Sequence, residues 1–125
     1  MADCLKITVG AVSFTATLRD TPTARAVAAA CPIEGSANTW GEEVYFGAAL
    51  DVAPESGQRA VVDAGEIAYW LEGNAIAIGY GPTPVSQGDE IRLAAPVNIF
   101  ADADPDAVRK LTGSTGGEPV KVELA

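Results

Sequence analysis

Asn38-Thr39-Trp40-Gly41-Glu42-Glu43-Val44-Tyr45-Phe46 is the stretch that decides the fold, because it gathers aromatic, apolar and carboxylate side chains in one short segment. Strand alternation would place one set of side chains on each face: Trp40, Glu42, Val44 and Phe46 on the first, Gly41, Glu43 and Tyr45 on the second. A carboxylate beside Trp and Phe loses solvent, which raises its pKa and suits it to acid–base or binding chemistry. The pattern predicts a strand beside a pocket, with Glu42 as the desolvated acid. The alternative is that Glu42 lies at the rim of the fold, stays ionised and accepts hydrogen bonds from loop amides.

Segments on both sides of this stretch alternate in the same way and predict further strands. With the central one, the expected strands cover residues 5–9, 14–18, 42–46, 60–62, 66–71, 75–78, 91–94, 97–100 and 120–124. Gly10-Ala11 joins the first two as a tight hairpin turn that needs a positive φ at glycine. Thr21-Pro22 and Asp104-Pro105 each pair a capping side chain with proline, so we expect short helices over residues 23–30 and from residue 104 to about 111.

Many short strands and only two short helices indicate a mostly β fold, a closed or nearly closed barrel with helices at its ends. Parallel crossovers need about a dozen residues each, and most connections here are shorter. We expect residues 1–125 to form a single domain.

Charge and composition narrow the class of partner. Asp and Glu number 17 against 8 Lys and Arg, for a net charge of -9, and the basic residues are scattered. Such a surface repels phosphate backbones and anionic lipids, so we expect neither nucleic acid nor membrane as a partner. The sequence shows neither a secretion signal nor an apolar run of membrane-spanning length, which favours a cytoplasmic protein, as a monomer or weak homo-oligomer.

The residue types of this chain do not favour a metal site or a cofactor site. The chain has no His and only two cysteines, Cys4 and Cys31, which we expect to pack as small apolar side chains rather than to form a bridge. Zinc rarely accepts an all-carboxylate site, and Pro105 interrupts the acidic run from Asp102 to Asp106 that could otherwise attract calcium. We therefore expect no metal and no cofactor, and we assign no catalytic residue.

A second aromatic segment covers residues 65–84. Tyr69 and Trp70 are adjacent and must point to opposite faces of a strand, so only one of them can line a given pocket. Gly79 and Gly81 flank Tyr80, where they allow a sharp bend or a close backbone approach, and Thr83 follows between two prolines.

Four motifs together resemble one prokaryotic family: residues 38–46, then Gly65-Glu66-Ile67-Ala68-Tyr69-Trp70 with Gly73 and Ala75, then Gly81-Pro82-Thr83-Pro84, and Ala95-Pro96-Val97-Asn98. The chain resembles the small cyclophilin-like proteins of unknown function. The resemblance implies a closed eight-stranded β-barrel with two short capping helices. One departure is Leu71-Glu72, where the family pattern has proline.

Function does not follow from this resemblance alone. Active cyclophilins hold a prolyl peptide with an arginine in a Phe-His-Arg motif on the strand after the first helix. Here the corresponding strand carries Glu42 and Glu43, and the charge is reversed. The leading hypothesis is a non-isomerase binding module for a small molecule or short peptide, with an acidic lining that favours a cationic or amide-bearing ligand. Its expected lining residues are Trp40, Glu42, Tyr45, Phe46, Tyr69, Tyr80 and Thr83.

Two alternatives remain open. One is a weak peptidyl-prolyl isomerase that uses Arg59, beside Gln58, as its cation. The other is a subunit or relative of an amide-handling enzyme of the carboxyltransferase type, because larger cyclophilin-like domains occur in such enzymes.

We predict that the protein does not accelerate cis–trans conversion of a prolyl peptide, because nothing replaces the missing donor against a barrier of about 18 to 20 kcal/mol. A proline-isomerisation assay checks this. Turnover that disappears in Arg59→Ala would contradict the prediction.

Overall fold

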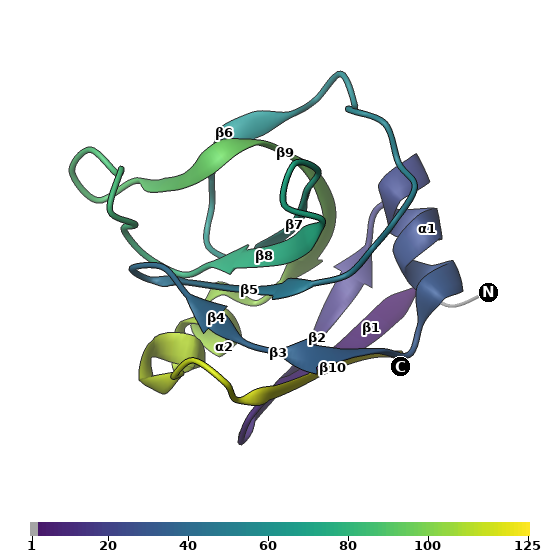
Figure 1. The fold of residues 1–125 in the computed structure, drawn as a ribbon, viewed down its shortest axis with the longest axis horizontal. Helices are drawn as coiled ribbons and strands as arrows, with labels where there is room; N and C mark the ends of the chain where they lie inside the picture. Colours follow the sequence, from purple (N-terminus) through teal and green to yellow (C-terminus); the bar gives the residue numbers. More distant parts are fainter. Residues whose placement is uncertain (1–2) are drawn as a thin grey trace.

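The computed structural model describes residues 3–125, so Met1 and Ala2 of the expected 1–125 domain lie outside it. Strands dominate this part of the chain (Figure 1). They are β1 (Cys4–Val9), β2 (Val12–Leu18), β3 (Ile33–Ser36), β4 (Asn38–Thr39), β5 (Glu43–Gly47), β6 (Arg59–Val62), β7 (Glu66–Trp70), β8 (Ala75–Gly79), β9 (Ile91–Ala103) and β10 (Pro119–Leu124). The helices are α1 (Pro22–Ala30) and α2 (Pro105–Arg109), and the latter continues into the 3-10 turn η1 (Lys110–Gly113).

The strands form one sheet that curls into a nearly closed barrel. Their order is β3-β10-β1-β2-β9-β7-β8-β5-β4, every pair is antiparallel, and β6 pairs with β9 off this path. The two edge strands, β3 and β4, are neighbours in the chain, and β3 packs beside β5. The mostly β barrel with two helices is confirmed, with ten strands in the described chain rather than the expected eight.

Local signals in the sequence produce the expected turn and caps. Gly10 has φ +57 in the hairpin between β1 and β2, as its turn requires. The hydroxyl of Thr21 accepts from the amide of Ala24 at the start of α1, and Asp104 caps α2 by accepting from the amide of Asp106. Each capped helix begins with proline, whose missing N–H costs nothing at that position.

Strand β9 corrects one expectation, because the predicted strands 91–94 and 97–100 are a single strand across Pro96. The first part of β9 pairs with β6, with Arg59 opposite Val97, and the second part pairs with β7 and β2. Pro96 is exposed and lies in the irregular stretch of the β6–β9 pairing between Arg92 and Val97, where it has no opposite residue, so its missing donor leaves no gap in a ladder.

Two apolar cores result from this change of partner. The larger fills the barrel and includes Phe46, Tyr69 and Phe100. The smaller lies outside the barrel, where β6 and the first half of β9 cover β7 and β8; Val62, Ala68, Ala77, Ile91, Leu93, Val97 and Ile99 form it. In the view of Figure 1, β6 and this part of β9 lie above β7 and β8.

Buried polar contacts hold the loop of residues 48–58 against the barrel. Asn98, on β9, is 1% exposed and donates to the hydroxyl of Thr23 and to the carbonyl of Ala53, both at 2.9 Å, while its amide oxygen accepts from the amide of Glu55 at 3.0 Å. Tyr69 adds a second anchor through its hydroxyl, which donates to the carbonyl of Ala48.

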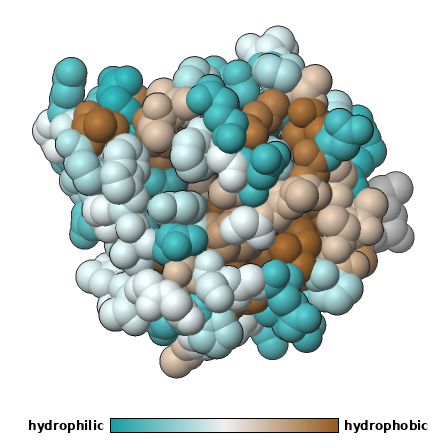
Figure 2. Space-filling view, viewed as in Figure 1, coloured by the Kyte–Doolittle hydropathy of each residue, from teal (hydrophilic) through white to brown (hydrophobic). Residues whose placement is uncertain are grey.

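The outer surface is mostly polar. Figure 2 shows polar residues over much of one face, with apolar surface toward its centre and right. Among residues 3–125, Val85 and Leu124 are the only large apolar side chains that are exposed. No helix in this described range is long and apolar enough to cross a membrane.

We expect Asn98→Ala to lower the free energy of unfolding by about 2 to 4 kcal/mol, because it removes three hydrogen bonds and leaves buried groups of α1 and the loop without partners. Urea unfolding measures the change. Asn38→Ala is the matched control: Asn38 is exposed and its amide makes one long bond of 3.4 Å. A loss below about 1 kcal/mol at Asn98 would show that this network does not hold the loop.

Candidate functional site

A turn before β5 moves Trp40 to the other face, and so corrects one part of the expected alternation. The strand begins at Glu43, and Gly41 in the preceding turn has φ +59. Val44 and Phe46 point into the barrel and are fully buried, whereas Glu43 and Tyr45 point to the outer side, where Trp40 joins them from the turn. The acid in apolar surroundings is therefore Glu43, not Glu42.

Glu42 lies at the rim, as its alternative placement proposed. It is half-buried, and its backbone joins the turn to the segment after β8: its amide donates to the carbonyl of Pro82, and its carbonyl accepts from the amide of Tyr80, both at 2.9 Å. Its carboxylate lies against Gly81, where any side chain would collide with it. Within residues 3–125 no hydrogen bond from a loop amide reaches this carboxylate, and the hydrogen bonds of Glu42 are made by its backbone.

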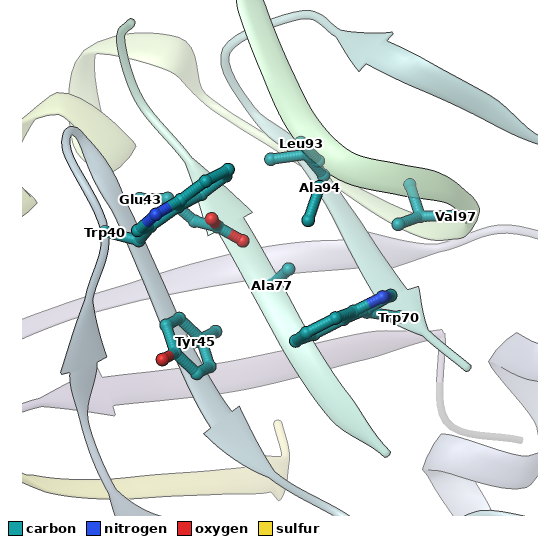
Figure 3. Close-up of a pocket in the computed structure, with 8 residues that line it drawn as sticks. All are labelled: Trp40, Glu43, Tyr45, Trp70, Ala77, Leu93, Ala94 and Val97. Carbon is teal, nitrogen blue, oxygen red and sulfur yellow. The ribbon is translucent and has the colours of Figure 1, made fainter. Parts of the chain in front are cut away.

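Glu43 and Tyr45 open into a pocket of about 270 Å³ on the outer side of the barrel. Its walls come from four places in the chain: the turn and strand β5, then β7, β8 and the first half of β9 (Figure 3). The lining residues are Trp40, Glu43, Tyr45, Trp70, Ala77, Leu93, Ala94 and Val97.

Glu43 is the one charged residue of this lining. Its residue surface is only 5% exposed, and within residues 3–125 no hydrogen bond or ion pair reaches its carboxylate. Figure 3 shows that carboxylate directed into the middle of the pocket. Burial without a partner disfavours the ionised form and raises the pKa of Glu43 to about 7.

Three aromatic rings surround this carboxylate. Tyr45 and Trp70 meet edge to face, with ring centroids 6.3 Å apart and planes at 86°. Figure 3 shows Trp40 and Trp70 on opposite sides of the pocket, both seen close to edge-on, with the Glu43 carboxylate and Ala77 between them. The Nε1–H of Trp70 is the one buried side-chain polar atom in the described chain that has no hydrogen-bond partner. The Glu43 carboxylate is therefore the unmatched polar group that faces the pocket.

The structure separates the seven side chains proposed from sequence. Trp40 and Tyr45 line this pocket, while Phe46 and Tyr69 are core residues, 0% and 1% exposed. Glu42 and Tyr80 border a different, more open depression. Thr83 is buried, and its hydroxyl donates to the carbonyl of Arg92.

Sequence reasoning missed Glu43 and Trp70 as lining residues. The signal was Gly41: a turn at this glycine brings Trp40 to the face that Glu43 already shared with Tyr45. The expectation that only one of Tyr69 and Trp70 lines a given pocket is confirmed, and Trp70 is the one. Leu93, Ala94 and Val97 come from a distant strand, and no local pattern connects them to residues 40–45.

Arg59, the cation of the isomerase alternative, lies elsewhere and is occupied. Its guanidinium donates to both oxygens of Glu66, at 3.2 and 2.6 Å, and Arg19 donates to the same carboxylate at 2.9 Å. Burial opposes ionisation of Glu66, but hydrogen bonds from Arg59, the Asp63 amide and Arg19 outweigh it and lower the pKa of this carboxyl. The described residues also contain no group of three or more Cys, Asp or Glu placed to hold a metal ion.

Comparisons with known proteins agree with this barrel. The model of the cyclophilin-like family matches residues 3–123. The chain belongs to the cyclophilin-like family. The resemblance drawn from residues 38–46 and the three later motifs is thereby confirmed, and this member carries an acidic residue, Glu43, in a pocket on the outer side of its barrel.

Two solved structures resemble this cyclophilin-like chain. The solution structure of the hypothetical protein AF2241 from Archaeoglobus fulgidus matches with a TM-score of 0.83 and 36% identity, over 99% of this chain and 95% of that one. McbB, solved in complex with tryptophan, matches with a TM-score of 0.70 and 15% identity, over 96% of this chain but 44% of its own, which shows a shared fold alone. A search of curated proteins found no significant match.

We expect Glu43→Gln to stabilise the protein at pH 8 by roughly 2 to 3 kcal/mol. The pKa of Glu43 is about 7 in the folded protein, against an ordinary 4.5. Between those two values the unfolded chain is already ionised while the folded protein retains its proton, so stability falls by about 1.4 kcal/mol per pH unit. Removing the carboxylate removes this penalty.

Urea unfolding at pH 4 and pH 8 measures the effect, and the difference between the two proteins should nearly vanish at pH 4, where Glu43 is protonated in both states. The control is Glu72→Gln, on an exposed turn residue, with a change within about 0.5 kcal/mol at either pH. A loss of stability in Glu43→Gln at pH 8 would mean that the carboxylate has a stabilising partner.

Proposed function

We propose that this pocket binds a small molecule, or one side chain of a short peptide, through a protonated nitrogen that pairs with Glu43. The observation that carries the proposal is the carboxylate of Glu43, a residue only 5% exposed, which has no hydrogen-bond or ion-pair partner in the described chain and faces into an aromatic pocket. Buried carboxylates are normally paired, and an unpaired one costs the fold stability. A cationic ligand supplies the missing partner, and the cost of desolvating the acid is then offset by the ion pair.

The aromatic walls favour the same class of ligand. The faces of Trp and Tyr rings carry negative electrostatic potential, so they attract a cation held over them. Trp40, Tyr45 and Trp70 surround the space into which Glu43 points. The net charge of -9 adds a long-range attraction for cations, which speeds their encounter with the protein.

The pocket's size limits the ligand to a small group. Its volume of about 270 Å³ corresponds to roughly nine water molecules at about 30 Å³ each. Pockets for drug-sized ligands begin at about 300 Å³, so this one suits a fragment-sized molecule or a single side chain.

A second candidate is proton transfer by Glu43, because a carboxyl with a pKa of about 7 can both accept and donate a proton at neutral pH. The lining of this pocket includes no Ser, Thr, Cys or Lys that would serve as a nucleophile. Proton transfer would therefore take place between Glu43 and the same bound cation as in the first candidate. The isomerase alternative has no support in this pocket, because Arg59 is not among its lining residues.

We expect benzylamine, which is cationic at pH 8, to bind the wild-type protein and to bind Glu43→Gln about 10- to 100-fold more weakly, the loss of one charge-assisted pair. Calorimetric titration measures both affinities. Benzyl alcohol, neutral and of similar shape, should bind both proteins weakly and alike. Equal affinity of benzylamine for the two proteins, or no binding by benzylamine and other aromatic cations such as benzamidine, would refute the proposal.

A further inference from the structure

We infer that the cation this pocket selects is planar, a guanidinium or amidinium group that lies between the indoles of Trp40 and Trp70 with its edge on the Glu43 carboxylate. The inference rests on the proposed function and specifies its ligand class.

The shape of the pocket is the first step. Trp40 and Trp70 stand on opposite sides, and each turns a ring face toward the space between them (Figure 3). The two facing rings bound a flat space between them, and Tyr45 meets Trp70 edge to face beside it. Guanidinium and amidinium groups are flat, and their faces stack on aromatic rings, whereas an ammonium group is tetrahedral and presents no face to stack.

Hydrogen-bond geometry is the second step. Glu43 has two carboxylate oxygens, and no hydrogen bond within residues 3–125 uses either of them. A planar cation offers two parallel N–H groups that match both oxygens at once. An ammonium directs its three N–H groups tetrahedrally, so at most part of the set meets the carboxylate, and the rest would point at apolar walls.

The apolar walls are the third step. Ala77, Leu93 and Val97 are 1%, 3% and 0% exposed and offer no side-chain acceptor, and the Tyr45 hydroxyl points away from the pocket centre in Figure 3. A cation must leave its water behind to enter such a space. A guanidinium is more weakly hydrated than an ammonium, so it loses less on entry.

Charge around Glu43 makes the pH dependence of binding interpretable. Of the lining residues contributed by the turn, β5, β7, β8 and β9, the only other titratable one is Tyr45, and none is basic. A guanidinium stays protonated throughout the neutral range. Binding that strengthens as the pH rises therefore reports ionisation of Glu43.

The test compares three probes of similar size by calorimetric titration at pH 8: benzamidine, benzylamine and phenyltrimethylammonium. We expect benzamidine to bind about tenfold or more tightly than either of the others, since it alone stacks and pairs with both oxygens. Its affinity should fall about 30-fold between pH 8 and pH 5.5, as Glu43 takes up a proton around its pKa of about 7. Glu43→Gln and Trp40→Leu should each weaken benzamidine binding, and Glu72→Gln, on an exposed residue outside the pocket lining, should leave it unchanged.

The outcomes separate this inference from the proposed function. Benzylamine or phenyltrimethylammonium binding as tightly as benzamidine, with the affinity still lost in Glu43→Gln, would overturn the planar slot and leave a general cation pocket. Binding of none of the three would overturn both. Agmatine and an acetylated Gly-Arg-Gly amide then distinguish the sources: a free guanidine compound is favoured if agmatine binds more tightly, and an arginine side chain of a peptide if the tripeptide does.

Discussion

The close fit of Gly41 against residues 82–84 is the constraint on which the pocket depends. A Cβ on Gly41 would lie 2.8 Å from the Cα of Thr83 and from the Cδ of Pro84, and φ +59 is itself unfavourable for other residues. The turn is held in place by two backbone hydrogen bonds, one from the Glu42 amide to the Pro82 carbonyl and one from the Tyr80 amide to the Glu42 carbonyl. Because the chain turns here, Trp40 leaves the face of Val44 and Phe46 and joins Glu43 and Tyr45 on the outer side.

The other half of the pocket is formed by the first half of β9, which extends beyond the barrel. Its second half is a barrel strand, and its first half leaves the barrel with β6 to cover the outer side of β7 and β8. Antiparallel sheets usually leave one face to water, and here part of that face becomes a second core. At its open edge this core becomes the pocket, with Leu93 and Val97 opposite Tyr45. Pro96 permits the change of partner, because it donates to neither ladder.

The sequence predicted elements better than it predicted the site, and the reason is physical. Hairpins, caps and alternating strands depend on neighbours in the chain, so Gly10, Thr21 and Asp104 could be assigned correctly. The family resemblance added the barrel. The pocket depends instead on one turn and on strands about 50 residues apart, as Glu43 and Leu93 are. Alternation correctly placed Glu43 with Tyr45 and Val44 with Phe46, but it could not show that the face of Val44 and Phe46 is the core or that the turn at Gly41 moves Trp40 to the face of Glu43. For Trp70 the sequence showed in advance only that it points to the face opposite that of its neighbour Tyr69.

Both tryptophans of the chain, Trp40 and Trp70, line the same pocket. Their intrinsic fluorescence therefore comes from this place alone, without an attached dye and without background from the rest of the barrel. Indole emission responds to nearby charge and to exclusion of water, so the spectrum of the intact protein senses the protonation of Glu43 and the filling of the space between the rings. The two tryptophans therefore act as intrinsic fluorophores on opposite walls of the pocket.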